Sequence, residues 1–246
     1  FPGELTFDVR GRHDTVPALA EHGPVLRLLV KMGSEAARAV ADKLEDDDPL
    51  ARYYAVRFFG YVSDASVVSR LAARLYDRDA LVRLSAIDVL MRYRSTEPFQ
   101  SLLKNLRRRL QSTMPDQQAI AAALLGNFKD PEAVDELLGL VKASEKMVAR
   151  AAQESLSYIT KQDFGSSQRK WRKWYAAHKE DPRVLWLIEG LRSKNRDVRF
   201  SSYRELNQLT EQHFDYYFDG SKSDREQAVA RWLQWWDETG SSKDFE

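Results

Sequence analysis

The sequence predicts an all-α fold, a solenoid of stacked antiparallel helix pairs with about twelve helices. Three observations predict it. The 246 residues include only 11 Gly and 8 Pro. Residues of high helix propensity recur along the whole chain. One amphipathic pattern also returns at a regular spacing, as it does in proteins whose repeats each pack only on their neighbours.

The pattern has a polar or small residue at a position that we call the slot, then Ala or Ser three residues later, then a large apolar residue four residues after that. The five slots are Arg52, Arg83, Gln118, Ala149 and Arg199. They are separated by 31, 35, 31 and 50 residues, so four of the five units fit one repeat length. The small residues Ala55, Ala86, Ala121 and Ala152 are expected at buried helix crossings, because this spacing puts small and large residues on one helical face.

A second amphipathic helix is predicted after each of the first three slot helices, over 65–76, 97–111 and 131–143. Each unit is therefore expected to be an antiparallel helix pair.

Helix starts are expected at three Asp-Pro pairs, because Asp can cap free N–H groups and Pro suits the first helical turn. These pairs begin at Asp48, Asp130 and Asp181. Asp48 precedes Arg52 by four residues and Asp79 precedes Arg83 likewise, a spacing that supports side-chain pairs. We expect these charges to cap helices and to brace neighbouring repeats; the alternative is a row of binding residues.

Two segments carry a family resemblance. DALVRLSAIDVL (79–90) and, less closely, DPLARYYAVRFF (48–59) resemble HEAT repeats of the short bacterial kind that is also found in phycobilin-lyase-related proteins. The resemblance covers roughly residues 23–210, although the slots at Gln118 and Ala149 lack the Arg of the family pattern. It implies a helical solenoid and says almost nothing about function, because this fold serves many unrelated tasks.

Residues 1–22 are expected to form a lead-in segment, and residues 23–246 a single solenoid domain. The part from 159 to 246 is rich in Trp and contains a duplication. Its matched pairs are Thr160 with Thr210, Gln162 with Gln212, Phe164 with Phe214, Trp171 with Trp232, Trp174 with Trp235 and Tyr175 with Trp236. Residues 215–225 are an insertion in the second copy and are expected to form a loop.

We expect the Trp residues to pack in the core; an aromatic platform for bases or a peptide would need them exposed. The ending of this Trp-rich part resembles the endings of HEAT proteins from myxobacteria and related bacteria. Those HEAT proteins are often attached to other modules. Because the sequence starts at Phe1 rather than Met, we treat it as a candidate piece of a longer multidomain chain.

The composition excludes several kinds of chemistry. The absence of Cys excludes disulfides, thiolate metal sites and Cys nucleophiles, and it favours a cytoplasmic location. The four His residues lack the spacing of a zinc helix, and Asp46-Asp47-Asp48 lacks the pattern of a calcium loop, so we predict a solvated capped turn there and no metal. No catalytic residue and no cofactor are predicted, and no apolar run is long enough for membrane insertion.

The favoured function is a non-catalytic scaffold for protein–protein interaction, which binds its partner on the concave face. Five cations on the two helices at 65–76 and 97–111 are predicted to form a basic strip for an acidic segment of a partner protein: Arg70, Arg74, Lys104, Arg107 and Arg108. A solvated face is the alternative for these cations and for a second basic cluster at 169–173. The alternative function is nucleic-acid binding or a DNA-glycosylase-like HEAT enzyme, which the net charge of +1 does not favour.

Overall fold

A computed structural model describes residues 22–243 and 245. Within these residues the chain forms thirteen α-helices joined by turns and short 3-10 segments, and contains no strand, which confirms the all-helical solenoid fold. The lead-in predicted for residues 1–22 lies outside the described residues except for His22. The chain divides into two compact units, an N-terminal unit that is described from residue 22 to 109 and a C-terminal unit that is described from residue 110. One continuous domain over 23–246 stays a prediction.

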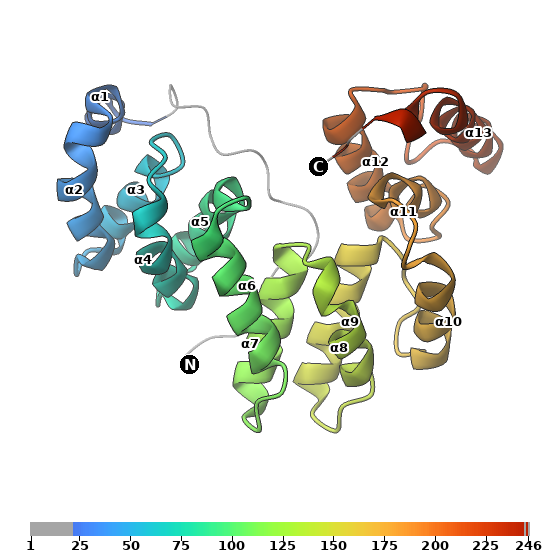
Figure 1. The fold of residues 1–246 in the computed structure, drawn as a ribbon, viewed down its shortest axis with the longest axis horizontal. Helices are drawn as coiled ribbons and strands as arrows, with labels where there is room; N and C mark the ends of the chain where they lie inside the picture. The colour runs from blue at the N-terminus through green and yellow to red at the C-terminus, as the bar shows by residue number, and fades with distance from the viewer. Residues whose placement is uncertain (1–21, 244, 246) are drawn as a thin grey trace. The chain divides into compact units, whose positions relative to one another are not determined.

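The N-terminal unit is a stack of helix pairs. Its helices are α1 (Pro24–Met32), α2 (Ser34–Asp42), α3 (Pro49–Phe58), α4 (Val68–Ala73), α5 (Ala80–Leu90) and α6 (Glu97–Arg109). Slot helix α3 packs on slot helix α5, and the second helices α4 and α6 pack on each other, as the N-terminal part of Figure 1 shows. The helix predicted over 65–76 is α4 with a 3-10 turn at each end.

The C-terminal unit contains the remaining helices: α7 (Pro115–Asn127), α8 (Val134–Leu140), α9 (Lys146–Thr160), α10 (Gln168–His178), α11 (Arg183–Gly190), α12 (Arg196–Thr210) and α13 (Lys222–Glu238). Helix α8 packs on α9 and α10, and α11 packs in the same way on α12 and α13. These six helices are therefore two three-helix repeats (Figure 1), which explains the 50-residue step between the last two slots.

The small residues of the pattern lie where slot helices cross. Ala55, Ala86, Ala121 and Ala152 are each at most 2% exposed, as predicted. The helices α7 and α9 approach so closely that a Cβ added at Gly126 would lie 2.5 Å from the Ser155 Oγ. The same Ser155 hydroxyl donates to the carbonyl of Ala122 at 2.8 Å, so this crossing is packed with small groups and carries no charge.

The slot arginines close the turn that precedes their own helix. Each guanidinium donates through Nη1 to two backbone carbonyls, five and six residues earlier, at 2.7–3.0 Å. The sets are Arg52 with Asp46 and Asp47, Arg83 with Asp77 and Arg78, and Arg199 with Ser193 and Lys194. Gln118 takes part of this role by donating to the Leu110 carbonyl at 2.6 Å. The slot is therefore a structural position.

Bracing between repeats is confirmed, and it uses different partners from those the spacing suggested. Arg52 binds both carboxylate oxygens of Asp77 in the next repeat, at 2.7 and 2.8 Å. Asp48 and Asp79 were expected to pair with the Arg four residues later; their carboxylates instead accept from backbone N–H groups, Asp48 from Leu50 and Asp79 from Leu81. Capping therefore takes the carboxylate that an i, i+4 pair would need.

Two of the three predicted Asp caps are correct. Asp48 caps α3, and Asp130 accepts from the Glu132 N–H at the start of the 3-10 turn before α8. Asp181 does not cap α11, which begins at Arg183, so that prediction was wrong. The Asp181 carboxylate lies 2.7 Å from the His178 Nδ1 instead, because the ring is only three residues away at the end of α10.

The duplicated Trp residues pack in the core. Phe164 meets Trp171 edge to face with ring centroids 4.9 Å apart, and Phe214 meets Trp232 at 4.7 Å. Trp171 and Trp232 are at most 1% exposed, which confirms core packing.

The insertion 215–225 forms a loop over residues 215–221, as predicted. Its last four residues are helical, because α13 begins at Lys222. Within that loop, Tyr216 is buried and its hydroxyl donates to the Leu191 carbonyl at 2.7 Å. The inserted residues therefore add to the core of the second three-helix repeat.

Replacing Ala86 with Leu is expected to destabilise the protein by about 1–3 kcal/mol, because extra methylene groups at a packed helix crossing force neighbouring side chains from their rotamers. Urea denaturation measures the effect. Ala80→Leu, at an exposed position of the same helix, is the matched control and should change the free energy of unfolding little. Equal stability of the two variants would contradict the assignment of Ala86 to a crossing.

Candidate functional site

The basic strip predicted from the sequence lies on α4, the 3-10 turn after it, and α6. Helices α4 and α6 pack on each other, so the five predicted residues lie on adjacent elements of two repeats. Arg70 pairs with Asp42 at 3.4 Å and with Glu45 at 3.0 Å, both in the preceding repeat. Arg74 pairs at 3.1 Å with Asp77, whose side chain is almost fully buried. The structure therefore gives Arg70 and Arg74 a bracing role.

The three cations of α6 differ in exposure. Lys104 and Arg108 are exposed, whereas Arg107 is half-buried. Arg108 donates to the side-chain oxygen of Asn105, one turn earlier. Among the described residues Lys104 has no ion pair or side-chain hydrogen bond. These two exposed cations are the part of the strip that solvent or a partner can reach.

A second charged site, which the sequence reasoning missed, lies in the C-terminal unit. Its central residue, Lys161, follows the last residue of α9 and has a left-handed backbone with φ of 58°. Thr160 fixes this turn: its hydroxyl donates to the Leu156 carbonyl at 2.7 Å and accepts from the Gln162 N–H at 3.2 Å. The turn directs a lysine side chain into the protein, where it is 1% exposed.

The same turn occurs at the end of α12. Thr210 donates to the Leu206 carbonyl at 2.7 Å, and the next residue, Glu211, has φ of 56°. Glu211 is exposed, however. The turn itself therefore does not require a buried charge at this position; the burial of Lys161 depends on α11 and α12, which pack against the end of α9.

Glu205 on α12 is the carboxylate of the site, and three cations converge on it. Its Oε2 lies 2.8 Å from the Lys129 Nζ and 3.3 Å from the Lys161 Nζ. Its Oε1 accepts from Arg183 Nε at 2.9 Å and Nη2 at 2.6 Å. The three cations come from the end of α7, the end of α9 and the start of α11, so Glu205 ties together four helices of the C-terminal unit.

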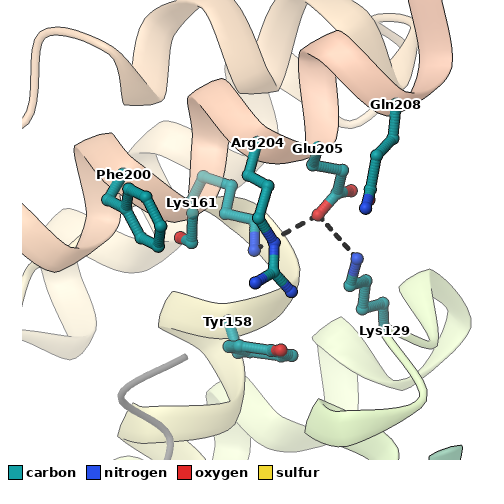
Figure 2. Close-up of a pocket in the computed structure, with 8 residues that line it drawn as sticks. Lys129, Tyr158, Lys161, Phe200, Arg204, Glu205 and Gln208 are labelled. Atoms are coloured by element: carbon teal, nitrogen blue, oxygen red, sulfur yellow. Dashed lines mark ion pairs between the residues drawn. The ribbon is translucent and has the colours of Figure 1, made fainter. Parts of the chain in front are cut away.

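A small pocket opens beside this cluster, and Figure 2 shows Lys129, Lys161 and Arg204 converging on it with the Tyr158 ring below. The Lys161 Nζ lies 4.4 Å from the centre of that ring, a cation–π contact. The remaining lining residues are Phe200, Ser201, Glu205 and Gln208. The pocket is thus lined by three cations and one carboxylate.

The pKa values of Lys161 and Glu205 are shifted because both groups are buried and lie among charged neighbours. Burial lowers the pKa of Lys161 to about 7, because the attraction of Glu205 does not offset desolvation and the repulsion of Lys129 and Arg183. Burial also acts on Glu205, but the combined attraction of the three cations outweighs it and holds the pKa of that carboxyl far below its usual range. Glu205 is therefore ionised at neutral pH, and Lys161 gains or loses its proton around pH 7.

The sequence did carry a weak signal for this site. In the 50-residue alignment of α9 with α12, Glu205 matches Ser155, the small residue of the uncharged α7–α9 crossing. A charged residue at a small, buried position points to a buried partner, but the partner could not be named, since Lys161 lies in another repeat. Among the described residues, no group of three or more His, Asp or Glu is placed to hold a metal ion. Nor is any described helix both long and apolar enough to cross a bilayer.

A family model described as HEAT repeats matches residues 37–112. The match runs from within α2 to just beyond α6 and includes residues 48–59 and 79–90, the two segments whose sequences resemble HEAT repeats. Among solved structures, the crystal structure of an engineered protein is similar, with 20% identity and a TM-score of 0.37 over 77% of this chain and 85% of that chain. The comparison with curated proteins found no match.

Replacing Glu205 with Gln is expected to cost about 3–5 kcal/mol of stability at pH 6, because it leaves the buried Lys161 ammonium without its carboxylate. The cost should be smaller at pH 9, where Lys161, with a pKa of about 7, is already neutral in the folded parent. Urea denaturation at the two pH values measures both costs.

Glu226→Gln is the matched control, since it breaks the exposed pair with Arg192 and should cost less than about 1 kcal/mol at either pH. In the parent, the unfolded chain keeps the Lys161 proton up to about pH 10.5, whereas the folded chain loses it near 7. The contribution of Lys161 to stability therefore rises from pH 7 to pH 10.5. An effect of Glu205→Gln that is equal at pH 6 and pH 9 would contradict the titration of Lys161.

Proposed function

We propose that this chain is a non-catalytic scaffold that binds an acidic segment of a partner protein through the basic strip of α4 and α6. HEAT repeats in general serve as scaffolds for protein–protein interaction, and residues 37–112, which contain the strip, match that family. In this proposal the partner binds on the concave face of the solenoid. The protein is bacterial and acts in the cytoplasm.

The observation that supports the proposal is the packing of α4 against α6, because these two helices carry most of the predicted cations. Lys104 and Arg108 are exposed on α6, and Arg70 on α4 is held by its pairs with Asp42 and Glu45. Arg108 carries the planar fork that suits carboxylates.

The alternative of a nucleic-acid-binding or glycosylase-like protein needs exposed aromatic rings beside the cations. Trp171, Trp174, Trp232 and Trp236 are all buried, and Trp235 is half-buried. The Trp-rich part therefore supports the core of the C-terminal unit, and its burial favours the protein scaffold over the alternative.

The double reversal Lys104→Glu/Arg108→Glu is expected to weaken binding of a Glu-rich model peptide at least about tenfold at ~0.1 M salt. Fluorescence anisotropy of the labelled peptide measures the affinity. Arg70 and Arg74 are left unchanged, because reversing either would oppose Asp42, Glu45 or Asp77 and disturb the fold.

The matched control is Arg169→Glu/Lys170→Glu, an equal change of charge on exposed residues at the start of α10. If the control weakens peptide binding and the strip variant does not, the binding face lies on α10 and the proposal is wrong. If the parent binds a single-stranded oligonucleotide more tightly than the peptide, the nucleic-acid alternative replaces it.

A further inference from the structure

Four large apolar side chains are exposed on the slot helices of the N-terminal unit. Leu50 and Tyr54 on α3 are 57% and 38% exposed, and Leu81 and Leu84 on α5 are 64% and 40% exposed. The members of each pair are three or four residues apart, so each pair lies on one side of its helix. Because α3 packs on α5, the two pairs lie on adjacent helices of one unit.

The two pairs point to the same side of the unit, because α3 and α5 have equivalent orientations. In both helices the small residue of the pattern is buried, and the slot arginine binds the carbonyls five and six residues earlier. Leu50 and Leu81 each lie two residues before the slot. Together with Tyr54 and Leu84 they form one exposed apolar surface, which we call the α3–α5 face.

The repeat does not require apolar residues on this face. Among the slot helices of the C-terminal unit, two carry an acid at the place of Leu50 and Leu81, Asp116 and Asp197, and one carries Met147. Helix α5 moreover has apolar residues on every side, a composition typical of helices that are covered all round. Exposed apolar residues that gather on one face of a protein mark an interaction site.

Charges at the two ends of the face indicate which partner fits it. At one end Arg57 on α3 pairs with Asp88 on α5 at 3.0 Å, so these charges are matched within the chain. At the other end Asp47 and Arg78 occupy equivalent places, each five residues before the slot of its repeat. Both are exposed, and neither side chain has an ion pair or a hydrogen bond within the described part of the chain. One turn therefore offers a carboxylate and the next a guanidinium.

These two turns lie side by side. Arg52 in the first turn of α3 binds Asp77, which directly precedes Arg78, at 2.7 and 2.8 Å. The chain reverses direction into α4 and again into α5, so α3 and α5 run in the same direction from adjacent starts. The α3–α5 face thus has the same layout twice, with opposite charges at its two turns.

We propose that the α3–α5 face binds the same face of a second copy of this chain in a two-fold symmetric dimer. A two-fold axis that runs along the helices, between α3 and α5, places α3 of one copy opposite α5 of the other, with both in the same direction. Leu50 then faces Leu81 of the partner subunit, and Asp47 faces Arg78 of the partner subunit. The symmetry makes each of these contacts twice.

Charge complementarity favours a second copy over another apolar partner. Any apolar surface could cover the leucines, but Asp47 and Arg78 also need opposite charges at a matching separation. The two-fold axis exchanges the two turns, so the carboxylate of one copy meets the guanidinium of the other at a separation that matches by symmetry. The dimer therefore covers the apolar residues and pairs both charges.

The apolar contact is tested with Leu81→Asp, which introduces the acid that the repeat already has at Asp116 and Asp197 and which suits the first turn of a helix. Met147→Asp makes the same kind of change at the equivalent exposed place of the C-terminal unit and is the matched control. Sedimentation velocity over a roughly hundredfold range of protein concentration gives the dissociation constant of the dimer. We expect Leu81→Asp to raise it at least about tenfold and the control to leave it unchanged. Circular dichroism checks that both variants fold.

The charge contact is tested with two single variants, Asp47→Arg and Arg78→Asp. Each places like charges opposite each other twice in its own dimer, so each should dimerise at least about tenfold more weakly than the parent. In an equal mixture of the two, the new arginine of one variant faces the new aspartate of the other, and the remaining contact is the native pair. The mixture should therefore form a dimer about as tight as that of the parent.

Three results would overturn the inference. The first is a parent that stays monomeric up to about 0.5 mM, which would leave the face to a different partner. The second is a dimer that Leu81→Asp weakens no more than Met147→Asp does. The third is a mixture of the two charge variants that dimerises no better than either variant alone. The variants leave every residue of the basic strip unchanged, so these results do not decide whether α4 and α6 bind an acidic segment.

Discussion

The rest of the structure depends on how each repeat closes the turn before its slot helix. A helix end leaves backbone carbonyls without donors, and a stack of helix pairs creates such an end in every repeat. Arg52, Arg83 and Arg199 supply two donors each, while Asp or Asn caps the helix that follows. The constraint has a functional consequence, since the most regular charges in the sequence are consumed inside the fold. Residues that bind a partner have to be sought among the charges that the repeat does not use.

Two sets of charges meet that criterion, and they differ in character. Lys104 and Arg108 are exposed on α6, and the side-chain partner of Arg108 is the neutral Asn105, so an acidic partner can reach both cations. At Glu205, the carboxylate and Lys161 are buried while Lys129 and Arg183 stay about a quarter exposed, and the cluster joins four helices. Surface cations can be reached by an acidic segment, whereas the charges around Glu205 pair with one another inside the C-terminal unit. The same helical architecture thus places one set of charges on its surface and another in the interior of the C-terminal unit.

The sequence predicted what local rules determine. Helical periodicity located most helices, and the small residues such as Ala86 and the Trp pairs were correctly predicted to be buried. The prediction failed where a side chain could bind more than one partner. Asp48 caps its helix and does not pair with Arg52, which binds Asp77 instead. Asp181 contacts His178 and does not cap α11. The Glu205 cluster could not be predicted, because Lys161 and Glu205 are 44 positions apart and only the packing of α11 and α12 on α9 brings them together. The pattern of residues within one repeat does not reveal a contact between Lys161 and Glu205, which lie in different repeats.

The central claim is that the buried charges of Lys161 and Glu205 stabilise each other, but add no more to stability than packed apolar side chains would at the same two positions. The most direct test is urea denaturation at pH 7 of the double variant Lys161→Met/Glu205→Leu, which replaces the buried pair by apolar side chains. Lys129 and Arg183 remain about a quarter exposed and can be solvated once the carboxylate is gone. The account predicts a free energy of unfolding equal to that of the parent or higher, as for other buried ion pairs replaced by packed apolar groups. A loss of about 3 kcal/mol or more would show that the cluster holds the fold together and would contradict the account.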